Sequence, residues 1–435
     1  MRPRFSLLLL LLAVLLSPTI LKAQDKLNGI ARQAASTDQK AAAAAIAELR
    51  SRGPAGLEAM FAAHAGAISQ QIIEPLTNST PEWERLSAAL DAVSQQKNSY
   101  LSGMYWYTDM GEAKAAAKRS GKPILSLRLL GNLSDEFSCA NSRFFRTILY
   151  SNATISKKLR EDFVLHWKSV RPVPRVTIDF GDGRKLERTL TGNSIHYILD
   201  VEGRIIEALP GLYGPNVFLR SLLASEEVFA KLRKAKDSNP GPELTAYRRG
   251  RIDALYVQWI ADIQKTGGKM PEGLVQVSTP NGTPTAILVA PAAVTKAVTE
   301  VSLLRSLTTG AESLGRVTDE ATWQRIARLH WSDAQLDSQS VGLIQRETQK
   351  VLGNIQLNAL LEKLMQNVAM DSVRNEYLMR ARIYGWLVLD QGRSDLETFN
   401  DKVYSEVFLT PASDPWLGLF TADTYMALDD SGVVR

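Results

Sequence analysis

The chain has 435 residues, enough for two or three domains, and its 45% apolar fraction excludes general disorder. Its net charge is +5, but three of its basic residues lie within the first 23, and without that segment the charge is +2. So small a basic excess does not indicate nucleic-acid binding or attraction to a membrane surface. We therefore expect a globular protein without a nucleic-acid partner.

The N-terminal segment has the layout of a secretory signal peptide. Arg2 and Arg4 supply a basic start, residues 6–16 form a leucine-rich apolar run, and Ala23 is a small residue at a suitable cleavage point. The run is shorter than the ~20 residues that span a bilayer, so an uncleaved anchor helix is the weaker alternative. We expect residues 1–23 to be removed, which gives a periplasmic or secreted protein with no stable membrane anchor.

Residues 24–104 are predicted to be a helical region. Apolar residues recur at helical spacing over 41–49 and 56–68, and a Gly-Pro turn separates the two stretches. A third amphipathic stretch covers 82–93. The first two stretches look like one HEAT-type helix pair, but no clear second copy follows that would indicate a solenoid.

Residues 105–235 change character, because short apolar runs typical of strands now alternate with helical patterns. Pro215 opens the last of these helical patterns, at a position that a helix start tolerates. The expected elements are helices over 109–120, 155–161 and 215–232, strands over 124–130 and 163–167, and hairpins over 176–190 and 195–209.

The only cysteine, Cys139, lies between the predicted strand over 124–130 and a helical pattern. A thiol at a helix N-terminus faces unpaired N–H groups and the positive end of the helix dipole, which favour the thiolate. Arg143 and Arg146, one turn on, would stabilise the thiolate further, and the Ser142 hydroxyl would donate a hydrogen bond to it. Such a thiolate can attack a disulfide of another molecule, but the chain has no second thiol to resolve the mixed disulfide.

Two stretches on either side of this cysteine resemble motifs of the thioredoxin-like superfamily. Residues 113–123 match the pattern A-x-x-x-A-K-x-x-G-K-P, which precedes the redox loop in secreted thioredoxin-like domains. Residues 192–204 are similar to the family's G-T-P-T-x-x-x-L-D-x-x-G-K hairpin. The resemblance covers under a third of the chain. It implies an α/β thioredoxin-like central domain over 105–235, with a mixed sheet flanked by helices, the 124–130 strand at its centre and Cys139 at a helix start.

The chain departs from that family at two functional positions. The family's second cysteine corresponds to Ser142, and its cis-proline, whose loop docks partner peptides beside the thiol, corresponds to Ser194. We expect a trans Asn193–Ser194 bond, because a cis bond without proline costs ~3 kcal/mol. The resemblance implies that Asn193 and Ser194 bind the substrate or partner beside Cys139. The hairpin over 176–190 stands where the family has a helix.

Residues 236–435 are predicted to form a mostly helical domain, which follows a Pro/Gly-rich linker at 237–242. Residues 267–284 are expected to form a loop, and the apolar segment 411–419 is expected to fold back onto the C-terminal domain. The predicted helices cover 244–263, 291–307, 319–329, 338–352, 355–368, 371–389 and 396–408.

The sequence supports two functions. In the first, an exported thioredoxin-fold protein acts as a monothiol thiol-disulfide oxidoreductase through Cys139. In the second, Cys139 is a small buried residue, and the degenerate domain with its helical flanks is a non-catalytic scaffold that binds a protein partner. Neither function requires a cofactor. No metal site is predicted, because the four histidines lack the spacing of a ligand motif; they are His64, His166, His196 and His330.

Overall fold

The computed structural model describes residues 18–73, 79–190, 192–234, 239–269, 314–315, 317–348, 354–390 and 392–416. The chain divides into two compact units, residues 1–94 and residues 95–435. The sequence predicts boundaries near residues 104 and 235, whereas the structure has one boundary, after residue 94. The predicted helix over 291–307 lies outside the described residues. Within them, no helix is both long enough and apolar enough to cross a bilayer.

The first unit is a set of helices packed on a small apolar core. Asp38 caps the second helix by accepting hydrogen bonds from the backbone N–H groups of Lys40 and Ala41. Gly56 allows the second and third helices to touch, since a Cβ atom there would lie 2.0 Å from the carbonyl oxygen of Leu49. The helices are α1 (Pro18–Ala34), α2 (Gln39–Ser51), α3 (Pro54–Ala63), α4 (Ala65–Ile73) and α5 (Pro81–Ser94).

A five-stranded mixed sheet forms the centre of the second unit, in the order β1-β3-β2-β6-β7. β1, β3 and β2 are parallel, whereas β6 is antiparallel to β2 and β7 is antiparallel to β6. This confirms that the 124–130 strand is central and that the second predicted hairpin is antiparallel. The strands are β1 (Trp106–Tyr107), β2 (Ile124–Leu130), β3 (Val164–Arg171), β6 (Ser194–Leu199) and β7 (Ile205–Pro210).

Every residue of β2, β6 and β7 is buried, so both faces of this sheet are covered. Asp109 starts the helix before β2 by accepting a hydrogen bond from the Glu112 N–H, and Gly121 ends it in a left-handed conformation. The helices of this part are α6 (Ser99–Ser102), α7 (Met110–Ser120), α8 (Ala140–Phe144), the π-helix η1 (Phe145–Leu149), α9 (Ala153–Asp162) and α10 (Pro215–Lys234).

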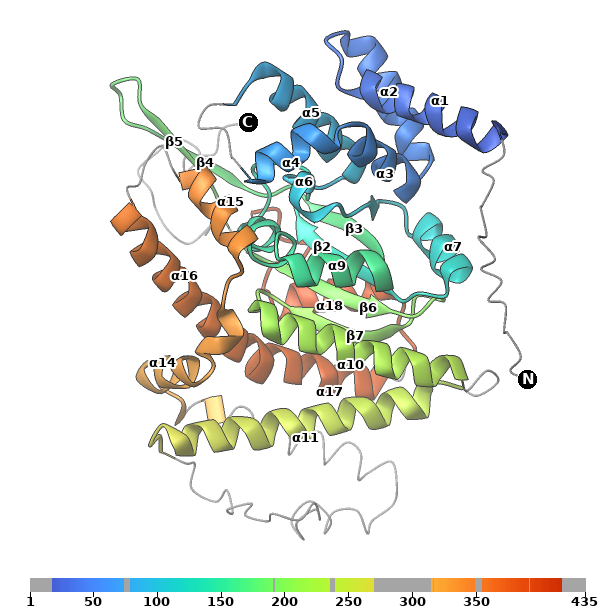
Figure 1. Ribbon diagram of the computed structural model, residues 1–435. Coiled ribbons are helices and arrows are strands. Elements are labelled where there is room, and N and C mark those ends of the chain that lie inside the picture. The colour runs from blue at the N-terminus through green and yellow to red at the C-terminus, as the bar shows by residue number, and fades with distance from the viewer. Residues whose placement is uncertain are drawn as a thin grey trace, which may run out of the picture. The chain divides into compact units, whose positions relative to one another are not determined.

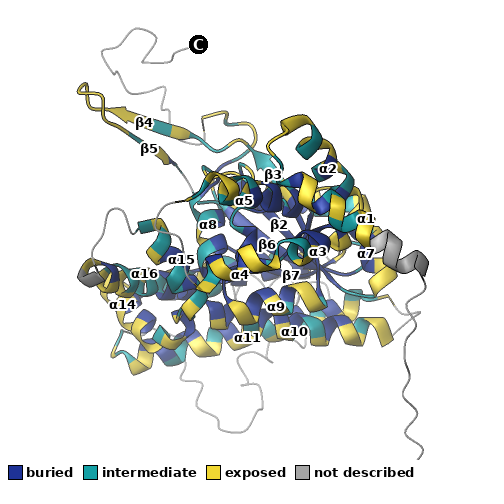
Figure 2. Ribbon diagram, turned by 45° about the horizontal axis from the view of Figure 1, so that its top comes forward, coloured by how far each residue is buried: buried dark blue, intermediate teal, exposed yellow. Residues whose placement is uncertain are grey.

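The predicted hairpin over 176–190 is present as β4 (Arg175–Asp179) and β5 (Lys185–Thr189), which pair with each other and not with the central sheet. Gly181 and Gly183 have positive φ values of 74° and 92° and form its turn. The hairpin projects from the body of the second unit, and most of its residues are exposed (Figure 2).

The C-terminal helices share one apolar core with the sheet. The expected break between helices at 369–370 is wrong: Ala369 and Met370 are helix formers and α16 continues through them. The helical pattern changes only after α16, where residues 375–380 form a π-helix. The elements are α11 (Gly241–Lys265), α14 (Glu320–Leu329), the 3-10 helix η3 (Trp331–Ala334), α15 (Ser338–Thr348), α16 (Asn354–Arg374), the π-helix η4 (Asn375–Arg380), α17 (Ala381–Asp390) and α18 (Leu396–Glu406). Figure 1 shows α10, α11 and α17 beside β7.

A fully buried ion pair joins the sheet to these helices. Glu207 Oε2 on β7 lies 3.0 Å from Arg380 Nη2 at the end of η4. The same carboxylate oxygen accepts hydrogen bonds of 2.7 Å from the hydroxyl groups of Tyr247 on α11 and Tyr384 on α17. Burial alone would raise the pKa of Glu207, but the Arg380 charge and the Tyr384 hydrogen bond outweigh burial and leave that pKa below its usual range. The ionised carboxylate thus connects three C-terminal elements to β7.

Replacing Arg380 by methionine is expected to lower the free energy of unfolding by about 3–5 kcal/mol, because Glu207 would stay buried without its counter-charge. Adding Glu207→Gln to Arg380→Met should restore part of that loss. Arg374→Met is the matched control, since Arg374 pairs with the exposed Glu320 and its loss should cost less than ~1 kcal/mol. Urea denaturation followed by circular dichroism measures these changes, and equal costs for the two arginines would contradict the central role of the buried pair.

Candidate functional site

Cys139 occupies the N-cap position of α8, which confirms that it lies at a helix start. Its backbone N–H donates a 3.2 Å hydrogen bond to the carbonyl oxygen of Leu130, the last residue of β2. The loop after the central strand therefore returns to the end of that strand before the helix begins. α8 itself is only 5 residues long, and the chain then continues as the π-helix η1.

The thiol is completely buried, with 0% of Cys139 exposed. Its sulfur lies 3.4 Å from Ser142 Oγ and 3.9 Å from the carbonyl oxygen of Asn193, and either oxygen can accept the S–H proton. Ser142 Oγ in turn donates a 2.8 Å hydrogen bond to the carbonyl oxygen of Cys139. The structure thus brings three of the predicted site residues together, around a thiol that has no exposed surface.

The two arginines predicted to stabilise a thiolate form hydrogen bonds with other groups. Arg143 Nη2 donates to Thr189 Oγ1 at 2.9 Å, at the base of the β4–β5 hairpin. Arg146 Nη1 donates to the carbonyl oxygen of Asp135 at 2.9 Å, and so holds the loop between β2 and α8. Both side chains therefore shape the surroundings of Cys139, while their effect on its thiolate stays a prediction.

The predicted partner-binding loop is occupied by residues of this same chain. The Tyr404 hydroxyl donates a 3.2 Å hydrogen bond to the carbonyl oxygen of Asn193, the oxygen that also faces the thiol. Asn193 Nδ2 donates to Thr410 Oγ1 at 3.1 Å and to the carbonyl oxygen of Phe408 at 3.5 Å. Ser194 is buried and begins β6, and its bond to Asn193 is trans, as expected.

These covering residues belong to α18 and the stretch after it, residues 396–416, which we call the closing segment. Arg171 at the end of β3 holds its last part, donating to the carbonyl oxygens of Thr410, Pro411 and Asp414 at 2.8, 3.3 and 2.9 Å. The segment 411–419 is predicted to fold back onto the C-terminal domain, but its described part, to residue 416, contacts the central sheet at β3. Leu409 turns the chain after α18 with a left-handed φ of 53°, at a position where glycine is usual.

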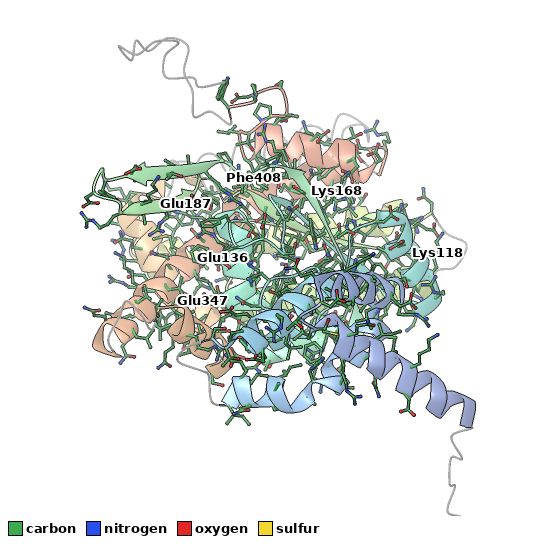
Figure 3. The ribbon with its side chains drawn as sticks, turned by 90° about the horizontal axis from the view of Figure 1, so that it is seen from above. Lys118, Glu136, Lys168, Glu187, Glu347 and Phe408 are labelled. Carbon is green, nitrogen blue, oxygen red and sulfur yellow. The ribbon has the colours of Figure 1, made fainter. Side chains whose placement is uncertain are left out.

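Two ion pairs hold the start of the closing segment to the sheet. Arg128, which is fully buried on β2, has its Nη2 atom 2.7 Å from Glu397 Oε1. Lys168 on β3, labelled in Figure 3, lies 2.9 Å from the other carboxylate oxygen of Glu397. Burial would raise the pKa of Glu397, but the charges of Arg128 and Lys168 and their hydrogen bonds outweigh burial and lower it. The closing segment is therefore attached to the sheet at both of its ends.

An aromatic and imidazole cluster lies on the inner side of the site. His196 Nε2 on β6 lies 2.6 Å from the hydroxyl oxygen of Tyr150, and the rings of Phe145 and Phe218 pack against the imidazole. Burial lowers the pKa of His196 to about 3 and raises that of Tyr150 well above its usual value. Both groups are thus neutral near pH 7, and they form a hydrogen-bonded core pair. Sequence patterns could not show Tyr150 or Tyr404 beside the thiol, because their partners are distant in the chain.

The histidines of the sheet do not meet. His166 on β3 and His196 on β6 lie on opposite sides of β2. His166 Nδ1 is 2.8 Å from Ser126 Oγ, and burial together with the charge of Arg128 lowers the pKa of His166 to about 3. Among the described residues, no group of three or more His, Cys, Asp or Glu side chains could hold a metal ion.

No family model matches the chain, and no curated protein or solved structure matches it either. The assignment of fold and function therefore depends on the sequence motifs and on the geometry described above.

Replacing Ser142 by cysteine is expected to produce an internal disulfide with Cys139, because Ser142 Oγ, whose place the new sulfur would take, lies only 3.4 Å from Cys139 Sγ. The variant, refolded with oxidised glutathione, should lose about 2 Da and show no free thiol in denaturant. Ser138→Cys is the control and should keep both thiols, because adjacent cysteines rarely meet disulfide geometry. Two free thiols in the Ser142→Cys protein would contradict this geometry.

Proposed function

We propose that this chain is an exported thioredoxin-like protein that binds a protein partner without using its thiol, and that Cys139 is a structural core residue. One observation carries the proposal: the sulfur is fully buried, and the loop beside it is already occupied by the chain's own closing segment. Of the two functions that the sequence supports, this is the non-catalytic scaffold.

The thioredoxin-like part of the proposal is supported by connectivity. Three parallel strands precede an antiparallel pair, β2 is central, and the chain enters a helix at Cys139 soon after leaving β2. The mixed sheet, the central place of β2, the antiparallel second hairpin and the helix start at Cys139 are what the motif resemblance implied. The β4–β5 hairpin stands where the family has a helix, and the described part of the chain adds helices at both ends of this domain.

The lack of access to the Cys139 thiol disfavours thiol-disulfide exchange. A disulfide can be exchanged only if its sulfur reaches the attacking thiolate in line, which requires open space beside the thiol. In this chain Tyr404 and Thr410 bond to Asn193 in that place, and no second cysteine exists to release a mixed disulfide. A binding role needs neither access to the sulfur nor a resolving thiol.

Export and the class of partner rest on the sequence. The signal-like segment 1–23 supports a periplasmic or secreted location without a stable membrane anchor. A net charge of +2 without that segment gives little attraction to nucleic acid, so a protein partner is the better proposal.

Cys139 in the native protein is expected to react with oxidised glutathione at least ~100-fold more slowly than in guanidinium, because reaction requires unfolding of the core around it. Asn193→Ala, which removes two hydrogen bonds to the closing segment, should raise the native rate by roughly 10-fold. Asn216→Ala is the control, since it removes only an exposed hydrogen bond to Ser332. Adduct mass measured against time gives the rates.

Cys139→Ala should cost only roughly 1–2 kcal/mol of unfolding free energy, the cost of a small cavity in the core. A native Cys139 that forms the glutathione adduct as fast as a free cysteine would overturn the proposal in favour of a monothiol oxidoreductase.

A further inference from the structure

The β4–β5 hairpin is a separate two-stranded sheet, and within the described residues no third strand joins it on either side. A two-stranded ribbon is only marginally stable by itself, and a further strand on one of its edges stabilises it. Each free edge offers a row of unpaired N–H and C=O groups, along which a strand of another chain can be added. The hairpin is therefore a candidate surface for association.

The hydrogen bonds of the hairpin show which backbone groups of β4 point away from β5. The Phe180 N–H donates to the carbonyl oxygen of Arg184 at 3.1 Å, and the Leu190 N–H donates to that of Pro174 at 3.0 Å. In an antiparallel pair only every second residue exchanges hydrogen bonds with the opposite strand, so the even-numbered residues of β4 face β5. The residues whose N–H and C=O groups point outward are Arg175, Thr177 and Asp179.

The outer edge of β5 is less suited to a second strand. Thr189 at its end is buried, and its hydroxyl accepts a hydrogen bond from Arg143 and donates one to the carbonyl oxygen of Ser138. The middle of this edge carries Glu187, which is labelled in Figure 3. Antiparallel pairing of two β5 strands about Glu187 would place two carboxylates directly opposite each other, which destabilises the pair. The edge of β4 is therefore the better one.

The sequence of β4 is complementary to itself when two copies run antiparallel. With Thr177 on a two-fold axis, Arg175 of one copy is opposite Asp179 of the other, and Val176 is opposite Ile178. Opposite charges and apolar side chains in directly opposed positions stabilise antiparallel strands. Because the odd-numbered residues are the ones that point outward, the same register also pairs the free backbone groups of both copies.

The apolar face of the hairpin is exposed. Ile178 and Phe180 are 45% and 55% exposed, and Val176 and Leu186 share their face, because alternate residues of a strand point to the same side. In the register centred on Thr177 the two copies join these faces into one apolar surface. Apolar side chains gathered on one exposed face are typical of a protein–protein contact.

We propose that two copies of this chain associate through β4, which gives a four-stranded antiparallel sheet in the order β5-β4-β4-β5. Each copy contributes the same strand, so the contact closes as a two-fold dimer. The hairpin projects from the body of the second unit, and most of its residues are exposed, so β4 is accessible to a second copy (Figure 2). Self-association of this kind is independent of whether Cys139 is structural or reactive.

Sedimentation velocity of the complete chain, expressed with its signal-like segment, measures the association. A contact made by one strand from each copy is smaller than the ~1,200 Å² of a typical stable interface, so we expect a dimer with a Kd of roughly 1–100 µM. A protein that is still monomeric at about 300 µM would overturn the proposal. Growth into assemblies larger than a dimer would also overturn it, because a closed two-fold contact does not allow them.

Two charge reversals test the register. Arg175→Asp places two pairs of carboxylates opposite each other in the dimer, and Asp179→Arg places two pairs of guanidinium groups there. Each variant alone should dimerise at least ~10-fold more weakly than the unchanged protein. An equimolar mixture of the two variants should regain association, because their heterodimer again has two pairs of opposite charge. A variant that had only lost its folded hairpin would not be rescued by mixing.

Arg188→Glu is the matched control. Arg188 is an exposed cation on β5, and the residues in line with it across the proposed sheet are all apolar: Val176, Ile178 and Leu186. Reversing its charge should therefore change the dimerisation constant by less than ~2-fold. Equal weakening by Arg188→Glu and Arg175→Asp would overturn the proposed register, and so would a mixture of the two reversals that does not associate.

A cysteine on the two-fold axis gives a covalent readout. With Cys139→Ala as background, Thr177→Cys places two thiols opposite each other at the ~5.5 Å Cα separation of a hydrogen-bonded pair, which a disulfide can bridge. Oxidised glutathione should convert this variant to a covalent dimer, visible by electrophoresis without reductant. Asp182→Cys is the control and should stay monomeric, because the two turns lie at opposite ends of the proposed sheet. No crosslink at position 177, or equal crosslinking of both variants, would overturn the proposal.

Discussion

A carboxylate buried in the sheet is the constraint on which the second unit depends. Glu207 cannot remain ionised inside the protein unless cations and hydroxyl groups surround it. Arg380, Tyr384 and Tyr247 meet that requirement, and each comes from a different C-terminal element. The helices after residue 241 are therefore held to β7 by a polar requirement as well as by apolar packing, and the sheet and these helices have one continuous core.

The segment that follows these helices in the chain lies over the loop beside the thiol. α17 leads to α18, where Glu397 pairs with the buried Arg128 and with Lys168. The remainder of the closing segment is held by Arg171 and by Asn193. Its path covers the loop at Asn193 and Ser194, which the motif resemblance predicts to bind a partner. The charged side chains of the sheet thereby hold the segment that lies over Cys139.

The sequence allowed the local part of this structure to be predicted. An apolar run and a helical pattern on either side of Cys139 predicted the central strand and the helix start, and turn residues predicted both hairpins. These features depend on neighbours in the chain. The break expected at 369–370 was wrong, since nothing in those residues stops a helix and tertiary packing decided where the irregularity falls.

The non-local part could not be predicted. Arg128 lies on β2 among mostly apolar residues, and its partner Glu397 lies 269 residues further along the chain. The contact of Tyr404 with Asn193 spans 211 residues, and no periodicity or spacing reports on such a pair. The sequence therefore left the reactive and the buried cysteine as alternatives, and the structure favours the second because it shows what lies above the thiol.

The most direct test of this account is the alkylation rate of Cys139 in the native protein, measured as a function of urea concentration. The account predicts that the free energy of opening obtained from these rates approaches the global unfolding free energy of the second unit, with a similar dependence on urea. A small opening free energy that does not change with urea would show that the closing segment releases locally. That result would contradict a structural role for Cys139 and would return the reactive thiol to the centre of the function.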